Sequence, residues 1–364
     1  MTIRVLGGLL ALFAVVSGAV GDGGTGSLPT QARFPASVQG VTISTHGSGR
    51  DWARVGPMME TMRELKRLGV EWIAIHPYAG VSGDGTLRFE IDPAKPPAHV
   101  VRPIHAAHEL GLKILIKPHL AYWGSPFKWR GDIEFDSDEE WRRFWTGYER
   151  WIVLLAEVSR EADGFVVGTE LDRTLAHQSE WRRIIGQVRE RTRAPLTYAA
   201  NWTDYERVPF WEALDAIGIQ AYFPLTEEAT TNVERLARGW SERMRHLERF
   251  AAQHKRQILF TELGYNRSFN AAVEPWNAKS DGEGAASFQE LCMRIALRAI
   301  ENEPRVVGSF LWKWFPEPYP VGRNFQLATP GMKRVISDAW GGDEAEPLDQ
   351  STGISTPLTA PSRR

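Results

Sequence analysis

The sequence predicts a single-domain (β/α)8 barrel of the TIM type, and three observations lead to this fold class. Apolar runs rich in β-branched residues alternate with amphipathic runs of helical length along nearly the whole chain. Strands that are apolar at almost every position belong to a sheet covered on both faces. Eight strand–helix pairs in succession favour a closed barrel. A doubly wound open sheet is the alternative, but no glycine-rich dinucleotide turn follows the first strand.

Each expected element follows from these patterns. We expect strands at Gly40–Thr45, Val70–Ile75, Leu112–Lys117, Gly164–Thr169, Pro195–Ala200, Ala216–Ala221, Gln257–Thr261 and Val307–Lys313. We expect helices at Pro57–Leu68, Val100–Leu110, Asp138–Glu161, His177–Arg191, Glu206–Ala213, Thr231–His254, Glu283–Glu303 and Gly331–Trp340. Local signals agree, because Asp138 suits the N-cap of its helix, and Gly69 and Gly111 close helices just before strands.

The two ends of the chain differ in composition from the middle. Residues 1–19 read as a signal peptide, with Arg4, the apolar run from Val5 to Val16 and small residues up to Ala19. Residues 20–33 then form a flexible linker, 34–341 the barrel domain and 342–364 a disordered tail. We therefore expect a secreted or periplasmic monomer that leaves the membrane once the signal is cleaved. An uncleaved membrane anchor is the alternative.

Composition narrows the classes of partner. The formal net charge is −2, the pI is about 6.5, and no long basic run occurs, so neither nucleic acid nor an anionic membrane surface is an expected partner. The chain has 15 tryptophans. Indole rings stack on the apolar faces of sugars, although core packing accounts for most tryptophans in a barrel. Composition is thus compatible with a polysaccharide or oligosaccharide partner.

The chemistry of such a barrel lies at the C-terminal ends of its strands. Two of the expected strands run directly into a glutamate, Glu170 in the fourth and Glu262 in the seventh. A carboxylate at the end of a buried strand is costly unless it has a function or a partner. The two strands lie nearly opposite around the barrel, so both side chains can enter its mouth.

Paired carboxyl groups suit a retaining glycosidase, in which one attacks the anomeric carbon and the other protonates the leaving oxygen at a separation of about 5–5.5 Å. Their pKa values must then differ, and Tyr222 is placed to donate a hydrogen bond to Glu262. The alternative is structural: one glutamate pairs with a basic residue such as Lys117 or Arg173.

Three runs carry a family resemblance. These are Gly168-Thr169-Glu170-Leu171, Thr261-Glu262-Leu263-Gly264-Tyr265, and Lys117-Pro118-His119 followed by Trp129-Arg130-Gly131. From about Phe34 to Trp340 the chain resembles glycoside hydrolase family 113, a member of the large clan A of retaining barrel glycosidases. The resemblance implies hydrolysis of β-1,4-linked mannose, with Glu170 as acid/base and Glu262 as nucleophile. One position departs from the clan: Thr169 stands where most members have an asparagine that binds the sugar 2-hydroxyl.

Several strand-end and loop residues are candidates for binding the substrate. The resemblance places Trp312, which alternates with Trp314 on the last strand, under the sugar whose bond is broken. Asn201 is a candidate donor to the 2-hydroxyl. Together with Glu170 and Glu262, the candidate site residues are Tyr78, Lys117, His119, Trp129, Asn201, Trp202, Tyr222 and Trp312.

No zinc motif, phosphate-cradling loop or nucleophile elbow occurs, so we expect neither a metal nor another cofactor. Two alternatives to a β-mannanase stay open. The same mechanism can act on another β-glycan, such as a glucan, a xylan, or an envelope or biofilm polysaccharide. A carbohydrate-binding barrel without catalysis is also compatible with the fold.

Overall fold

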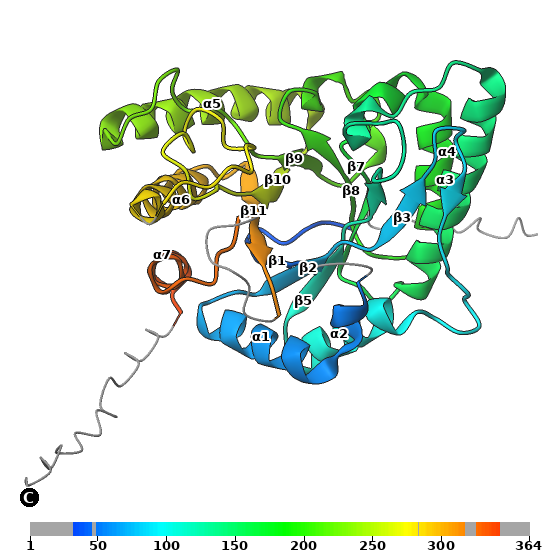
Figure 1. The fold of residues 1–364 in the computed structure, drawn as a ribbon, viewed down its shortest axis with the longest axis horizontal. Helices are drawn as coiled ribbons and strands as arrows, with labels where there is room; N and C mark the ends of the chain where they lie inside the picture. Colours follow the sequence, from blue (N-terminus) through cyan, green and yellow to red (C-terminus); the bar gives the residue numbers. More distant parts are fainter. Residues whose placement is uncertain (1–31, 46–48, 283, 317–324, 343–364) are drawn as a thin grey trace, which may run out of the picture. The chain divides into compact units, whose positions relative to one another are not determined.

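The computed structural model describes residues 32–45, 49–282, 284–316 and 325–342 (Figure 1). The expected signal peptide lies outside the described residues, as do nearly all of the expected linker and tail. No helix in the described ranges is both long and apolar enough to cross a membrane.

Eight parallel strands close into a barrel, which confirms the predicted fold class and rules out the open sheet. The strands follow one another around the barrel as β1 (Val38–Ile43), β11 (Val306–Trp314), β10 (Ile258–Leu263), β9 (Ile217–Gln220), β8 (Leu196–Asn201), β7 (Gly164–Thr169), β5 (Lys113–Ile116) and β2 (Trp72–Ile75), which returns to β1.

Alternation along the strands separates two buried clusters. Trp72, Leu115, Val166 and Leu259 belong to a smaller cluster, whereas their strand neighbours belong to the larger one. We assign the smaller cluster to the barrel interior and the larger to the layer between strands and helices. The interior is thus a packed core, and the substrate must bind at the mouth.

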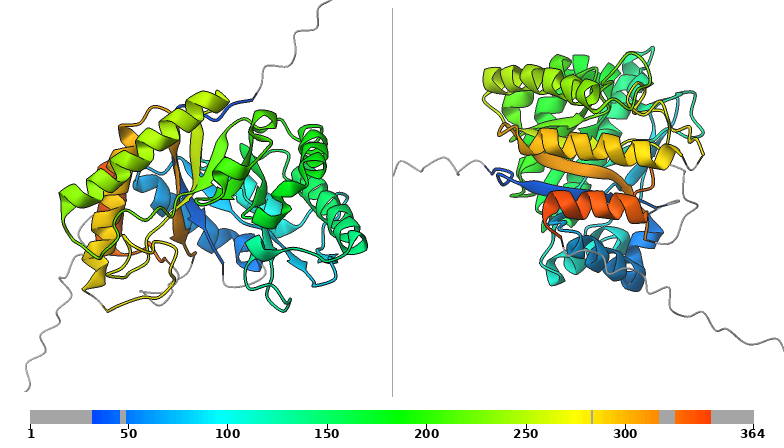
Figure 2. Two further views of the ribbon diagram at one scale, coloured as in Figure 1. Left: turned by 90° about the horizontal axis from the view of Figure 1, so that it is seen from above. Right: turned by 90° about the vertical axis from the view of Figure 1, so that its left-hand side faces the viewer.

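Helices cover the outside of the barrel. They are α1 (Val55–Arg67), α2 (Ala98–Glu109), α3 (Asp138–Val158), α4 (Gln178–Arg189), α5 (Val233–His254), α6 (Ala285–Glu301) and α7 (Pro330–Trp340). On one flank α5, α6 and α7 lie side by side (Figure 2). Gly69 and Gly111 have φ values of 86° and 69°, which fits the predicted helix ends. The predicted cap of α3 was wrong by one residue, because Ser137 forms a capping box with Glu140.

The helix expected at Glu206–Ala213 was also wrong. Two short 3-10 turns, η4 (Tyr205–Arg207) and η5 (Trp211–Ala213), replace it. Pro209 lies between them and supplies the reason. Proline has no backbone N–H, and its ring disfavours a helical conformation of the preceding residue.

A small second sheet, which the sequence analysis did not anticipate, follows two barrel strands. It has the order β4 (Leu87–Arg88), β3 (Tyr78–Val81), β6 (His119–Ala121). Its strand β3 comes just after β2, and β6 comes just after β5. The pairing of β3 with β6 sets Tyr78 directly opposite His119. The sheet therefore holds two of the candidate binding residues together at the C-terminal end of the barrel.

Candidate active site

Irregular backbone turns both glutamates toward the mouth of the barrel. Phe260 and Glu262 of β10 are two residues apart, but they pair with consecutive residues of β9. Strand β10 therefore has one extra residue at this point. Such a bulge changes the direction in which the following side chain points. Without it, Glu262 would share the outward direction of Phe260, two residues earlier.

Glu170 is placed by a strained backbone. Its φ is 50°, in the left-handed region that side chains other than glycine rarely adopt. Two hydrogen bonds hold this conformation: the Glu170 N–H donates to the Ala199 carbonyl at 2.9 Å, and the Leu171 N–H donates to the Tyr198 hydroxyl at 2.7 Å. Strain of this kind costs about 1–3 kcal/mol and concentrates at functional sites.

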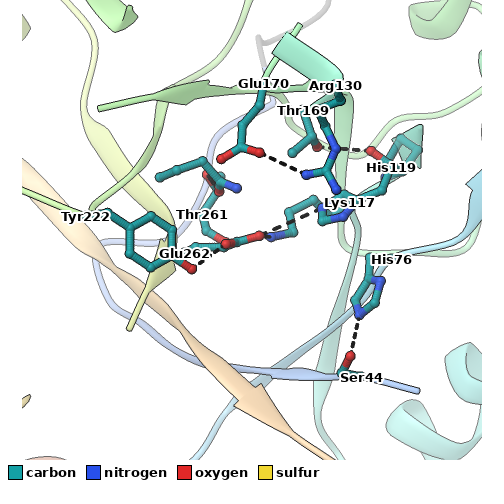
Figure 3. A network of polar contacts seen from close by, with 12 residues as sticks. Ser44, His76, Lys117, His119, Arg130, Thr169, Glu170, Tyr222, Thr261 and Glu262 are labelled. Atoms are coloured by element: carbon teal, nitrogen blue, oxygen red, sulfur yellow. Dashed lines mark hydrogen bonds and ion pairs between the residues drawn. The ribbon is translucent and has the colours of Figure 1, made fainter. Parts of the chain in front are cut away.

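The Glu262 carboxylate accepts hydrogen bonds from two buried side chains (Figure 3). Lys117 Nζ binds Oε1 and also donates to the Thr261 carbonyl at 3.2 Å. The Tyr222 hydroxyl donates to Oε2 at 2.6 Å, as predicted. Both donors favour the ionised form of a carboxyl group. Of the two basic partners considered from sequence, Lys117 pairs with Glu262, whereas Arg173 lies near Glu134 on the surface.

The pairing of Lys117 with Glu262 leads to a prediction about stability. The Lys117→Met variant leaves the Glu262 carboxylate buried without its counter-charge, which costs about 3–5 kcal/mol of unfolding free energy. Urea denaturation measures this difference. The double variant Lys117→Met/Glu262→Leu removes both charges and should recover much of the loss. A single variant within about 1 kcal/mol of the wild type would contradict the prediction.

Glu170 lies in a different environment. Its Oε2 accepts from Arg130 Nη1 at 2.8 Å and from Trp129 Nε1 at 3.4 Å, and 12% of the side chain is exposed. Burial raises the pKa of Glu170, as does the negative charge of Glu262, while the Arg130 guanidinium acts in the opposite direction. The two carboxyl groups lie near one another in the mouth (Figure 3). The site thus combines a strongly hydrogen-bonded carboxylate with a carboxyl group that retains its proton more readily.

Four aromatic rings form a wall beside Glu262. The His119 ring stacks on Trp312 with a centroid distance of 5.9 Å and on His76 at 5.1 Å, and Tyr78 packs edge-on against both histidines. His119 Nε2 is buried 3.8 Å from Glu262 Oε1 and has no hydrogen-bond partner in the described part of the chain. A sugar hydroxyl could satisfy this nitrogen.

Both histidines of this wall are neutral. Burial and the nearby cations, among them Lys117 and Arg130, lower the pKa of His76 and of His119 well below the usual range. His76 Nε2 lies 3.0 Å from Ser44 Oγ, which fixes the orientation of its ring. Neutral imidazoles can donate to or accept from sugar hydroxyls without adding charge to the site.

Two further candidates, Trp202 and Asn201, interact with residues other than the two glutamates. The ring of Trp202 stacks on Trp276 at 5.2 Å, with 45% of Trp276 exposed. The Asn201 side chain lowers the pKa of the neighbouring Asp172 carboxyl group, in opposition to the effect of burial. Trp314 is 1% exposed and contributes to the core, so Trp312 is the member of that pair that reaches the site.

Several residues of the site were not predicted. Arg130 belongs to a motif quoted for the resemblance, yet nothing local indicated that it binds Glu170 forty residues away. Asp172 has a pKa raised to about 8, mainly by burial and then by the neighbouring Asp204. Lys313 is a charged residue at the end of a predicted strand, and this was its signal in the sequence. Burial lowers the pKa of Lys313 to about 8. No group of three potential metal ligands occurs within the described ranges.

Barrels that hold a pair of carboxyl groups at the ends of opposing strands are typical of glycoside hydrolases, and this protein is of that class. The model of Glycoside Hydrolase Family 113 matches residues 42–326. The chain therefore belongs to glycoside hydrolase family 113, which confirms the resemblance.

Solved structures agree with this assignment at the level of the fold. A family 113 β-mannanase from Alicyclobacillus acidocaldarius, in complex with ManMIm, is 24% identical with a TM-score of 0.72, and the match covers 84% of this chain and 97% of that one. A second family 113 β-1,4-mannanase is 19% identical with a TM-score of 0.72, covering 84% and 99%. A family 5 mannosidase from Rhizomucor miehei is 11% identical with a TM-score of 0.55, covering 85% and 93%. None of the curated proteins matches this chain in sequence.

Proposed function

We propose that the protein hydrolyses β-1,4-mannosidic linkages in mannan, glucomannan or manno-oligosaccharides with retention of configuration. The observation that carries this proposal is the asymmetry of the two carboxyl groups. Glu262 accepts hydrogen bonds from Lys117 and Tyr222, which suits an ionised nucleophile. Burial raises the pKa of Glu170, which suits an acid that must hold a proton before it donates it. The two family 113 neighbours are a β-mannanase and a β-1,4-mannanase, which supports the choice of sugar.

The reaction proceeds in two displacements. Glu262 attacks the anomeric carbon while Glu170 donates its proton to the leaving oxygen, and a glycosyl ester forms on Glu262. Glu170, now ionised, takes a proton from the incoming water, which attacks the same carbon and releases Glu262. Each carboxyl group returns to its starting protonation state, so the enzyme is ready for the next cycle.

The aromatic wall provides the binding surface for the sugar. Trp312 offers a ring face on which the reacting sugar stacks, and His119 Nε2 lacks a partner that a hydroxyl would supply. The Thr169 hydroxyl already donates its proton to the Pro118 carbonyl at 3.0 Å, so it does not also donate to the sugar 2-hydroxyl. Asn201, at the end of the neighbouring strand β8, remains the candidate donor to that hydroxyl.

Arg130 leads to a prediction about pH dependence. The general acid must be protonated, so activity falls as pH rises through the pKa of Glu170. The Arg130 guanidinium lowers that pKa, so Arg130→Leu should raise it further. We therefore expect the basic limb of the kcat/KM profile to move to higher pH in Arg130→Leu and to stay near its original position in Arg130→Lys. A limb that stays in place or moves down in Arg130→Leu would count against Glu170 as the acid.

Product analysis tests the substrate. The purified protein is incubated with β-1,4-linked manno-, gluco- and xylo-oligosaccharides, and the products are separated by chromatography. Shortened manno-oligosaccharides are the expected outcome. Cleavage of only the gluco- or xylo-series would assign the same mechanism to another β-glycan. Binding without any cleavage would support a carbohydrate-binding barrel instead.

The N-terminal sequence supports a further part of the proposal, export of the protein. Expression in a Gram-negative host and N-terminal sequencing of the mature chain should give a start at residue 20, consistent with cleavage after Ala19. A full-length chain retained in the membrane fraction would indicate the uncleaved anchor. Light scattering of the mature chain tests the separate expectation that the exported protein is a monomer.

A further inference from the structure

Three cationic side chains lie around the two glutamates in the described part of the barrel mouth. Lys117 and Arg130 each pair with one of the two glutamates. Lys313, at the end of β11, adds a third cation whose charge interacts with Glu262, Lys117 and Arg130.

Among the described residues, the groups next to these cations do not supply a further carboxylate for Lys313. The two histidines of the aromatic wall are neutral, and a pKa of about 8 leaves Asp172 mostly uncharged near pH 7. Asp204, beyond Asp172, already pairs with Arg207. Among the described residues of this cluster, Lys117 and Arg130 are thus paired with carboxylates, and Lys313 is not.

Lys313 is half-buried and has no carboxylate partner among the described residues. Its Nζ lies 4.8 Å from the centroid of the Trp312 ring and 5.3 Å from that of Phe315. An ammonium group that is held against aromatic rings and forms no ion pair recovers only part of the hydration free energy that it loses on burial. The position beside Trp312 places it next to the sugar that this ring would carry.

Two more polar atoms in the cluster lack hydrogen-bond partners within the described ranges. Arg130 Nε is buried without a hydrogen bond, as is His119 Nε2. Buried polar groups are normally satisfied, so groups that are not indicate a place where a ligand supplies hydrogen bonds. The unpaired polar atoms and the unpaired cation thus belong to one cluster at the mouth.

We propose that this site takes an anionic β-glycan, in which a sugar bound at Trp312 or next to it carries a carboxylate that pairs with Lys313. This inference rests on the proposed function and names the substrate class more narrowly. A neutral mannan would leave Lys313 without a carboxylate partner, whereas a carboxylate on the sugar would supply one. A charge-assisted hydrogen bond from a poorly hydrated ammonium group would favour the acidic sugar over the neutral one.

The test compares two tetrasaccharides with the same linkage and the same epimer: mannotetraose and the β-1,4-linked mannuronate tetrasaccharide, which differs by a carboxylate at C6 of each sugar. Their dissociation constants are measured by calorimetry at low ionic strength on the Glu262→Ala variant, which cannot consume them. Their kcat/KM values are measured on the protein with both glutamates. Each measurement is repeated with Lys313→Met and Lys313→Arg.

Lys113 offers a matched control. It also lies over a tryptophan, with Nζ 5.4 Å from the Trp72 ring centroid, but at the opposite end of the barrel where β5 begins. We expect the mannuronate tetrasaccharide to bind about tenfold more tightly than mannotetraose, and Lys313→Met to remove most of this preference. Lys313→Arg should retain much of it, and Lys113→Met all of it. Thermal unfolding of each variant confirms that it is folded.

The outcomes separate this inference from the proposed function. If mannotetraose is cut but the acidic tetrasaccharide is not preferred, or if Lys313→Met leaves the preference unchanged, the inference fails and the proposed function stands. If neither tetrasaccharide is cut but the preference and its dependence on Lys313 are found in the binding data, the inference stands and β-1,4-mannosidic cleavage fails.

Discussion

Replacing Glu262 with alanine is expected to lower kcat by about 10⁴-fold or more on β-1,4-linked manno-oligosaccharides. The reason is that the first displacement then has no nucleophile, and neither Lys117 nor Tyr222 can form the glycosyl ester in its place. Steady-state kinetics of the purified variant measures the loss. The exposed Glu134, near Arg173 on the surface, provides the control, because Glu134→Ala should leave kcat unchanged.

A chemical rescue makes this prediction specific to the role of a nucleophile. Azide is small enough to occupy the space that the carboxylate vacates, and it attacks from the same face of the sugar. With an aryl β-mannoside that has a good leaving group, Glu262→Ala should therefore form the α-mannosyl azide. Formation of the β-azide, or near-normal turnover without azide, would show that Glu262 is not the nucleophile.

Local patterns in the sequence were sufficient to predict the barrel. A strand such as β7 (Gly164–Thr169) is apolar along its length and flanked by helices with clear periodicity, so its type and its bounds followed from the residues alone. Its order in a closed barrel followed from the number of repeats. The long α5 and α6 were predicted for the same reason, since long periodic segments carry the strongest signal.

The parts of the fold that were missed depend on single residues or on distant pairing. Pro209 prevents the helix that we expected after β8, although the surrounding residues have a helical pattern. The strands β3 and β6 are three or four residues long, and they pair across about forty residues of chain. Segments of that length show no alternation that could be distinguished from a loop.

The residues of the site likewise include some that the sequence predicted and some that it did not. Glu170, Glu262 and Tyr222 were predicted because each follows a strand, and strand ends converge at the mouth. The ion pair of Arg130 with Glu170 could not be predicted, because Arg130 comes from a loop whose path no periodicity determines. The left-handed backbone at Glu170 was also unpredictable, since glutamate carries no preference for that conformation.

The two carboxyl groups are positioned by different means, and this difference matches the two roles proposed for them. Glu262 lies within β10 and is held by hydrogen bonds from two buried side chains, which fixes its carboxylate as a nucleophile that forms a covalent bond requires. Glu170 lies one residue beyond β7, and its side chain contacts a loop arginine and a loop tryptophan. That arrangement allows the carboxyl group to serve first the leaving oxygen and then a water molecule.

This reasoning gives the last prediction, which concerns Glu170→Ala. Loss of the acid should lower kcat/KM by about 10³-fold or more for manno-oligosaccharides, whose leaving oxygen needs a proton. The loss should be much smaller for dinitrophenyl β-mannoside, because dinitrophenolate departs without protonation. Measuring both substrates on one preparation provides an internal control for folding and for active-site concentration.

Azide again identifies the role. In Glu170→Ala the mannosyl ester on Glu262 still forms from the activated substrate, but no base assists water in the second displacement. Azide needs no base, so it should accelerate turnover and give the β-mannosyl azide, which retains the configuration of the substrate. The opposite stereochemistry from that of Glu262→Ala would assign the two glutamates independently. An equal loss on both substrates, or the α-azide from Glu170→Ala, would contradict the assignment of Glu170 as acid/base.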